Sequence, residues 1–319
     1  MDLQLRSELL ARGWTDADLR RLRRSGELAP LRRGSYRPGP ADGPDTPEAR
    51  HALLVRATLP HLGPGWVVSH QSAAVLLGLP VWDVPLDRVH VSRDGTGGGR
   101  VTRGVHRHVG RLADTEVVRL GGVRLTGPGR TVVDVAGTVA FEQAVVIADA
   151  ALAPFQDDRP ALLDRAGLLA ALARGGRIGR SAARRVVAFA DGGARSPGES
   201  RSRVAMWLAG LPAPVLQFEV RGPDGRLLGI VDFGWPELRT VGEFDGRVKY
   251  GRLLRPGRHP EDAVFAEKLR EDAIRGTDLG MVRWTWPDLD RFEPVAQRLH
   301  RTFRAAHAPV IRAWPDMRS

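Results

Sequence analysis

The chain has 319 residues, with 48 lysines and arginines against 37 acids and a formal net charge of +11 at pH 7. A single domain usually has about 150 residues, so we expect two or three modules. The absence of cysteine excludes a disulfide scaffold, a cysteine nucleophile and a cysteine-ligated zinc finger. No apolar run is long enough for a membrane span and the N-terminus lacks the apolar core of a signal peptide, so we expect a cytoplasmic protein.

Arginine supplies almost all of the positive charge, because only Lys249 and Lys268 are lysines. Alanine, glycine, valine and proline are also abundant, a composition that a bias in the coding sequence can produce, so we discount the total charge. The remaining excess still favours a polyanionic partner, either nucleic acid or an anionic membrane. Of these two we expect DNA and no membrane, on the basis of the charge distribution and the predicted elements of residues 1–40.

Two stretches rich in proline and glycine predict linkers, PGPADGPDTP at 38–47 and DGGARSPGES at 191–200. They predict three domains, at 1–40, 48–190 and 196–319. Residues 1–40 hold nine arginines against five acids, whereas residues 251–300 hold nine residues of each sign. The first segment is therefore a local basic patch.

The first segment predicts two helices and a β-hairpin. The first helix has an apolar face made of Leu3, Leu5, Leu9 and Leu10. Gly13 ends it, and Thr15 is a good N-cap for a second, basic helix that ends at Gly26. ELAPLRRGSYRPG then predicts a hairpin with its turn near Arg33 and Gly34. Together these elements predict a small winged helix-turn-helix.

Seven arginines of this segment are candidates for DNA contacts. Those of the second helix would enter the major groove, and those of the hairpin would contact phosphates. They are Arg20, Arg21, Arg23, Arg24, Arg32, Arg33 and Arg37. The alternative is a solvated arginine-rich face without a ligand.

The middle segment predicts a mixed α+β domain. EARHALLVRATL and SHQSAAVLLGL have helical spacing, while RVHVSR, VTRGVHRHV and VVRLGGVRLT alternate as strands do. Apolar spacing predicts further helices within 130–152, 161–175 and 180–191. His106 and His108 have no third ligand at metal spacing, so we expect them to be surface or cross-strand histidines.

The final segment predicts an α/β core in the order α-β-β-β-α-β-α. The expected helices cover 199–210, 260–276 and a closing stretch from about Pro287, and the expected strands cover 213–220, 227–235, 239–246 and 280–286. We expect the tryptophans of these strands, Trp235, Trp284 and Trp286, to lie in the core.

Three acids stand inside the apolar strands of this segment. Asp232 follows the run GIV, and Glu243 and Asp245 lie in TVGEFDG. Carboxylates in a core strand are costly unless they are paired, hydrogen-bonded or bound to metal. If the two strands are antiparallel neighbours, the carboxylates converge, and a divalent cation such as Mg²⁺ or Mn²⁺ removes their repulsion. The alternative is a set of salt bridges to the many arginines.

Two further residues complete this candidate site. Lys249 follows in EFDGRVKY, and a compact ammonium suits a position beside a metal-bound water and a phosphate. Glu199, on the preceding helix, is a candidate for the metal's inner or outer coordination shell.

Residues 196–290 resemble the PD-(D/E)XK nuclease superfamily, and more closely the small domain related to very-short-patch-repair endonucleases. The resemblance rests on SPGESRSR, GIVDFGWP, VGEFDGRVKY and EKLREDAIRG followed by GMVRWTW. It implies a restriction-endonuclease-like core and Mg²⁺-dependent phosphodiester hydrolysis. Asp232 and Glu243 would be metal ligands, and Glu199 an auxiliary acid.

The chain departs from this superfamily at Asp245, which stands where the superfamily has lysine. The related small domain often has a DGxxH pattern here, and Lys249 occupies the place of its histidine. Two interpretations stay open. Either the catalytic lysine has moved to Lys249, or the site is inactive.

Residues 1 to about 155 resemble the AbiEi-type antitoxins of type IV toxin–antitoxin systems. The matching stretches are RLRRSGELAPLRRGSYRPG, SHQSAAVLLGLP, HVSRDGTGGGRVTRGVHRHVGRL and VRLTGPGRTVVDVAG. The resemblance implies an N-terminal winged helix that binds operator DNA and a nucleotidyltransferase toxin as partner. We therefore expect a DNA-binding protein with a Mg²⁺-dependent endonuclease domain. The alternative is a non-catalytic antitoxin or repressor whose nuclease-like domain is inactive.

Overall fold

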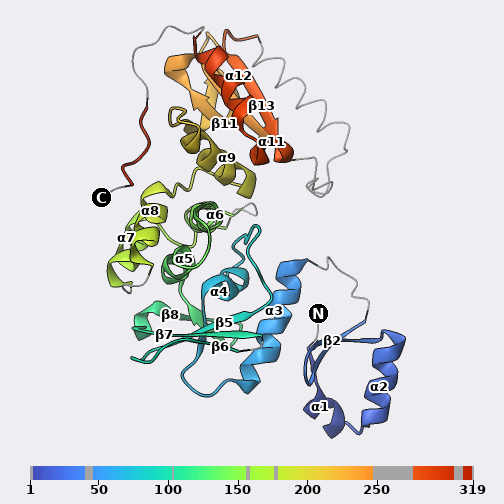
Figure 1. Ribbon diagram of the computed structural model, residues 1–319. Coiled ribbons are helices and arrows are strands. Elements are labelled where there is room, and N and C mark those ends of the chain that lie inside the picture. Colours follow the sequence, from blue (N-terminus) through green and yellow to red (C-terminus); the bar gives the residue numbers. More distant parts are fainter. Residues whose placement is uncertain are drawn as a thin grey trace. The chain divides into compact units, whose positions relative to one another are not determined.

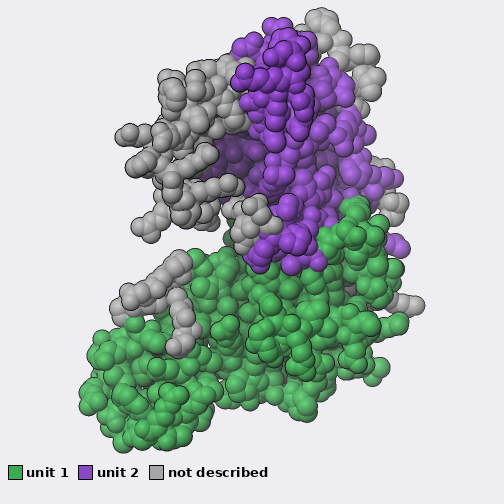
Figure 2. Space-filling model, turned by 180° about the vertical axis from the view of Figure 1, so that it is seen from behind, with its two compact units in different colours: residues 1–143, 163–183 green, residues 144–162, 184–319 purple. Residues whose placement is uncertain are grey.

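The structure is a computed structural model. It describes residues 3–39, 46–102, 104–155, 159–175, 179–246, 276–304 and 312–317. These residues form a multidomain, mixed α/β protein with sheets of three, six and four strands (Figure 1). The chain divides into two compact units, unit 1 with residues 1–143 and 163–183, and unit 2 with residues 144–162 and 184–319 (Figure 2).

Unit 1 begins with two short helices and a three-stranded antiparallel sheet. The elements are β1 (Gln4–Leu5), α1 (Arg6–Ala11), α2 (Asp16–Ser25), β2 (Leu28–Arg32) and β3 (Ser35–Pro38), and the strand order is β1-β3-β2. Leu9, Leu19, Leu28 and Tyr36 form a small core between the helices and the sheet. Residues 3–39 are called the N-terminal module below.

The local signals of this module are largely confirmed. The Thr15 hydroxyl accepts a hydrogen bond from the Asp18 amide and caps α2, which ends at Gly26 with φ +82°. Gly34, with φ +79°, makes the tight hairpin turn. The prediction that Leu5 lies in the first helix is wrong, because Leu5 pairs with Ser35 in the sheet and α1 begins one residue later.

The rest of unit 1 is a six-stranded sheet covered by helices. Its strands are β4 (Val67–Val68), β5 (Val89–Arg93), β6 (Arg100–Thr102), β7 (Val105–Val109), β8 (Val117–Leu120) and β9 (Val123–Thr126), in the order β6-β7-β5-β4-β9-β8. The helices are α3 (Pro47–Thr58), α4 (His70–Leu76), α5 (Pro128–Ala136) and α7 (Arg165–Arg174). The β5–β7 and β4–β9 pairs are parallel, and the other neighbours are antiparallel.

The residues of strand β5 show that this sheet has one apolar face and one polar face. Val89 and Val91 are fully buried and belong to a core cluster that includes Val55 of α3. His90 and Ser92 alternate with them, so they point to the opposite face of the sheet. That face carries a polar cluster, described below.

Unit 2 is built on a four-stranded sheet. Its strands are β10 (Val215–Arg221), β11 (Leu227–Trp235), β12 (Thr240–Asp245) and β13 (Gly280–Thr285). The strands lie in the sheet in the same order as in the chain, and of these strands only β12 and β13 pair in parallel. Its helices are α6 (Phe141–Leu152), α8 (Arg180–Phe189), α9 (Pro197–Leu208), α11 (Trp286–Asp290) and α12 (Glu293–Arg304), of which α6 and α8 begin in residues assigned to unit 1. The helix predicted for 260–276 falls almost wholly in residues 247–275, outside the described part of the chain.

The sheet of unit 2 packs against aromatic side chains. Trp235 and Trp284 are buried, as predicted, in a cluster that includes Phe233 of β11 and Leu299 of α12. A continuous helical pattern was predicted over 130–152. The structure breaks it into α5 and α6 after Gly137, whose amide bonds back to the last turn of α5. Among the described helices, none has the length and apolar character to cross a membrane.

Candidate functional site

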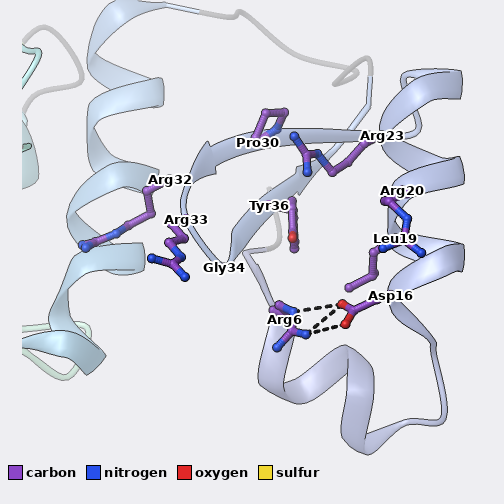
Figure 3. Close-up of a pocket in the computed structure, with 10 residues that line it drawn as sticks. All are labelled: Arg6, Asp16, Leu19, Arg20, Arg23, Pro30, Arg32, Arg33, Gly34 and Tyr36. Atoms are coloured by element: carbon purple, nitrogen blue, oxygen red, sulfur yellow. Dashed lines mark hydrogen bonds and ion pairs between the residues drawn. The ribbon is translucent and has the colours of Figure 1, made fainter.

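A basic cavity of about 560 Å³ lies between α2 and the β2–β3 hairpin of the N-terminal module (Figure 3). Five arginines and one acid, Asp16, line it together with four other residues. The arginines are Arg6 from α1, Arg20 and Arg23 from α2, and Arg32 and Arg33 from the hairpin. The cavity is therefore strongly positive and suits a polyanion.

The seven predicted arginines do not contribute equally to this cavity. Arg20 and Arg23 are three residues apart and share one face of α2. Arg21 pairs with Asp18 at 3.0 Å and does not line the cavity, and neither do Arg24 and Arg37. Arg6 is a lining residue that the sequence analysis missed, because its position depends on the pairing of β1 with β3.

The hairpin arginines extend toward α3 (Figure 3). Arg32 donates from Nη1 to the Thr58 hydroxyl at 2.7 Å, so its guanidinium is held in place within unit 1. Burial and the nearby charge of Arg107 lower the pKa of Arg32 from its usual value. Arg33, by contrast, is exposed next to the turn.

In unit 2, the structure brings Asp232 and Glu243 to neighbouring antiparallel strands. The register pairs Phe233 of β11 with Gly242 of β12. Because the strands are antiparallel, the residue before Phe233, which is Asp232, lies across from the residue after Gly242, which is Glu243. Residues directly opposite share a face of an antiparallel sheet. Asp232 also accepts a hydrogen bond at 2.8 Å from the backbone amide of Phe244. The condition for convergence of the two carboxylates, that their strands are antiparallel neighbours, is therefore met.

Glu199 lies at the first turn of α9 and is buried. Its carboxylate accepts hydrogen bonds from the Arg195 amide at 2.9 Å, the Ser196 hydroxyl at 2.8 Å and the Gln217 amide nitrogen at 3.2 Å. Burial raises the pKa of Glu199, and the first two hydrogen bonds oppose that shift. Within the described residues, these contacts give Glu199 a capping role at the start of α9.

Gln217 donates a hydrogen bond to Glu199 and lies across from one of the two strand acids, but the sequence pattern does not single it out. The β10–β11 register places Gln217 across from Asp232, between the pairs Leu216–Phe233 and Phe218–Val231. Its φ of +50° is unusual for a residue other than glycine and lies in the middle of a strand. Strained backbone positions of this kind concentrate at functional sites.

The remaining predicted site residues have different surroundings. Glu243 forms an ion pair at 2.7 Å with Arg283, its register partner on β13. Asp245 is exposed at the end of β12. Lys249 lies outside the described residues, so its predicted role as a catalytic ammonium stays a prediction.

A second cluster of titratable side chains lies on the polar face of the sheet in unit 1. His70 begins α4, His90 lies in β5, and His106 and His108 lie in β7, which is parallel to β5. The ring centroids of His70 and His108 are 3.7 Å apart, and those of His106 and His108 are 4.0 Å apart. Nδ1 of His90 lies 3.1 Å from Nε2 of His108.

Burial holds these imidazoles in their neutral form. Together with the smaller effect of neighbouring histidines, it lowers the pKa of His90 to about 3 and that of His108 to about 4. Burial is also the main reason why the pKa of His70 lies well below its usual value. The cluster therefore offers nitrogen lone pairs, not positive charges, at neutral pH.

The sequence analysis singled out His106 and His108 but not their partners. One signal was available, because six of the nine histidines fall between 51 and 108. Bringing His90 and His108 together requires the parallel β5–β7 register, which local periodicity does not specify.

Comparisons with known proteins assign no function to these sites. No protein-family model matches the chain. Two uncharacterized proteins of Mycobacterium tuberculosis, MT2308 of strain CDC 1551 / Oshkosh and Rv2248 of strain ATCC 25618 / H37Rv, are each 36% identical to it over 141 residues. The match covers 44% of this chain and 48% of each relative, so the chain spans about half the length of the curated relatives it matches. The crystal structure of the RV2827C protein from Mycobacterium tuberculosis is 18% identical, with a TM-score of 0.37, over 70% of this chain and 85% of that chain.

Proposed function

We propose that the N-terminal module is a winged helix-turn-helix that binds duplex DNA, with α2 as the helix that enters the major groove. The observation that carries this proposal is the cavity between α2 and the hairpin, lined by five arginines and a single acid. Arginine is the residue best suited to bidentate contacts with phosphate and with guanine. The hairpin would act as the wing and contact the DNA backbone.

The dimensions of α2 support this arrangement. Its ten residues span about 15 Å, and the major groove is about 12 Å wide and admits one helix. Arg20 and Arg23 lie on the face that the cavity exposes, while Leu19 packs into the module's core. The two arginines can therefore reach a ligand without unpacking the helix.

Fluorescence anisotropy with a labelled DNA duplex tests this proposal. We expect the double variant Arg20→Ala/Arg23→Ala to bind about tenfold more weakly or worse, since each arginine contact with DNA contributes roughly 1–3 kcal/mol. Arg12→Ala/Arg119→Ala removes the same charge from exposed positions of unit 1 that do not line the cavity. If both double variants lose the same DNA affinity, the loss reflects the change in net charge alone, which would refute a specific role for α2.

A second candidate function, Mg²⁺-dependent hydrolysis of DNA, is favoured by the facing positions of Asp232 and Glu243. Two carboxylates that face each other suit Mg²⁺, which usually takes one or two protein carboxylates and completes its coordination with water and substrate phosphate. Asp232 and Glu243 would hold the ion, and Glu199, which accepts a hydrogen bond from Gln217, would be an auxiliary acid. A bound Mg²⁺ would acidify a water and offset charge on the phosphate.

The Glu243–Arg283 ion pair instead favours the non-catalytic alternative, because it gives the carboxylate a structural partner. In that alternative the chain is a repressor or type IV antitoxin, with a nucleotidyltransferase toxin as a partner. Cleavage of duplex, nicked and single-stranded DNA with Mg²⁺ or Mn²⁺ separates the two functions. Activity that disappears in both Asp232→Asn and Glu243→Gln supports hydrolysis, and wild-type protein that binds DNA without cutting it supports the repressor.

A further inference from the structure

Three of the clustered histidines of unit 1 have the arrangement of a metal site. One ligand nitrogen from each of His70, His90 and His108 lies within 4.8 Å of the other two, and no other such set of three occurs among the residues that the structure describes. We propose that His70, His90 and His108 bind one Zn²⁺ ion. This site is separate from the arginine-lined cavity and from the acids of unit 2, and it does not depend on DNA binding.

The distances within the cluster are close to those of a zinc site. Imidazole nitrogens bind Zn²⁺ at about 2.0–2.1 Å in a tetrahedral arrangement, which places two ligand nitrogens about 3.4 Å apart. The 3.1 Å between His90 Nδ1 and His108 Nε2 nearly matches that spacing. The ligand nitrogen of His70 lies within 4.8 Å of the other two and would have to move closer for all three to bind one ion.

The hydrogen bond between Gln71 and His90 suits a metal-bound imidazole. Gln71 Nε2 lies 2.8 Å from His90 Nε2, while the buried Gln71 Oε1 has no hydrogen-bond partner among the residues that the structure describes. A half-turn of the amide lets Oε1 accept a hydrogen bond from His90 Nε2–H. His90 Nδ1 then carries the lone pair and can bind the metal, while a carbonyl oxygen fixes the ring from behind, as is usual for metal-binding histidines.

The backbone at His70 is a second, independent sign of function. His70 has φ +53° at the start of α4, a conformation that residues other than glycine rarely adopt. Its Nδ1 lies 3.0 Å from the Ser69 hydroxyl, which accepts a hydrogen bond from Ser92. In the tautomer in which Nδ1–H of His70 donates to the Ser69 hydroxyl, His70 Nε2 carries the lone pair and is the ligand atom. Strain of this kind persists where the surroundings enforce it, and it concentrates at ligand sites.

The charge around the cluster permits a dication. Arg130 is the nearby positive charge that acts on His70. It is paired with Glu116 at 3.0 Å and with Asp134 at 2.8 Å, so two carboxylates offset its charge.

The ligand types select the metal. An all-imidazole set suits Zn²⁺, Cu²⁺ and Ni²⁺ better than Mg²⁺ or Ca²⁺, which prefer oxygen ligands. Three protein ligands leave one position open to water, as in catalytic zinc sites. The ion would also connect α4, β5 and β7, three elements that are distant in sequence.

Calorimetric titration of the EDTA-treated full chain with ZnCl₂ tests the proposal. We expect one equivalent to bind. His70→Gln and His108→Gln should each weaken binding by about 100-fold or more, and Gln71→Leu by about 10- to 100-fold. His61→Gln, at an exposed histidine of the same unit, is the matched control and should bind as the wild type does. Far-UV circular dichroism reports whether each variant is folded.

Co²⁺ provides a readout that needs no variant. Bound by three imidazoles in a four-coordinate site, it gives intense visible absorption bands, whereas six-coordinate Co²⁺ absorbs weakly. Wild-type protein that binds no Zn²⁺ at micromolar concentration, or that gives only the weak Co²⁺ spectrum, overturns the proposal. So does unchanged Zn²⁺ affinity in folded His70→Gln and His108→Gln.

Discussion

Asp16 joins the first turn of α2 to the start of α1 by accepting three hydrogen bonds from Arg6, at 2.7, 2.8 and 3.1 Å. Both side chains are about half exposed, and because solvent screens ion pairs of this kind they contribute little to stability. Asp16 is also the only acid among the residues that line the basic cavity. The pair therefore matters more for the charge of the cavity than for the fold.

Replacing Asp16 should strengthen DNA binding. Asp16→Asn removes the negative charge from the cavity and releases Arg6 for a phosphate, so we expect affinity for duplex DNA to rise a few-fold while the free energy of unfolding falls only slightly. Anisotropy and urea denaturation measure the two effects. Glu27→Gln neutralises an acid of the same module outside the cavity and should change DNA affinity less. Weaker DNA binding by Asp16→Asn would contradict the assignment of the cavity.

A buried ion pair stabilises unit 2. Arg203 Nη1 donates to Asp149 Oδ2 at 2.5 Å, its Nη2 donates to the Phe189 carbonyl, and both charged side chains are almost fully buried. Arg203→Met leaves the Asp149 carboxylate without its counter-charge, so the free energy of unfolding should fall by about 3–5 kcal/mol. The double variant Asp149→Leu/Arg203→Met should recover much of this loss. Urea denaturation measures these free energies of unfolding. A loss below about 1 kcal/mol in Arg203→Met alone would be inconsistent with a buried ion pair.

Asp134 makes the stability of unit 1 depend on pH. It shares Arg130 with Glu116, and its Oδ2 is buried without a hydrogen-bond partner. Burial raises the pKa of Asp134 from 3.8 to about 6, so the folded state favours the protonated acid. The stabilisation is complete below about pH 4 and is lost as pH rises through 6. A shift of about two pKa units corresponds to roughly 3 kcal/mol.

Asp134→Asn removes this titration and tests its sign. We expect the unfolding free energy of the variant, relative to the wild type, to increase between about pH 4 and pH 7. Urea denaturation at each pH provides the comparison. A relative stability that stays constant or decreases over this range would mean that Arg130 keeps Asp134 charged throughout.

Gly198 permits the close approach of α9 to β12. A Cβ at this position would overlap the ring of Phe244, next to the strand position of Glu243. We expect Gly198→Ala to lower the free energy of unfolding by about 1–3 kcal/mol, since the ring must move. Thermal denaturation measures the loss, and Gly210→Ala is not a suitable control because φ there is +68°. Gly63→Ala, with open space around its Cβ, is suitable and should have a smaller effect.

Signals that act within a few residues were readable from the sequence. The Thr15 cap, the turn at Gly34 and the strands of Asp232 and Glu243 depend on neighbours in the chain or on clear alternation, and the structure agrees with them. Leu5 shows the limit of this reasoning. Its helical spacing was real, but pairing with Ser35 of the hairpin outweighed it.

Features that depend on strand register were not readable. The position of the hairpin determines which arginines of α2 line the cavity. Arg20 and Arg23 line it, whereas Arg21 and Arg24 do not. The histidine cluster needs the parallel β5–β7 pair. A one-residue shift of that register would turn His108 to the opposite face of the sheet.

The salt dependence of duplex DNA binding tests the central claim most directly. Between about 50 and 200 mM salt, the logarithm of the association constant should fall linearly with the logarithm of salt concentration, by about 0.9 for each phosphate contact. We predict that Arg33→Ala, on the hairpin expected to contact the DNA backbone, lowers this slope by about 1, whereas Arg12→Ala, outside the cavity, leaves it unchanged. Binding that does not respond to salt, or an unaltered slope in Arg33→Ala, would contradict DNA recognition by the N-terminal module.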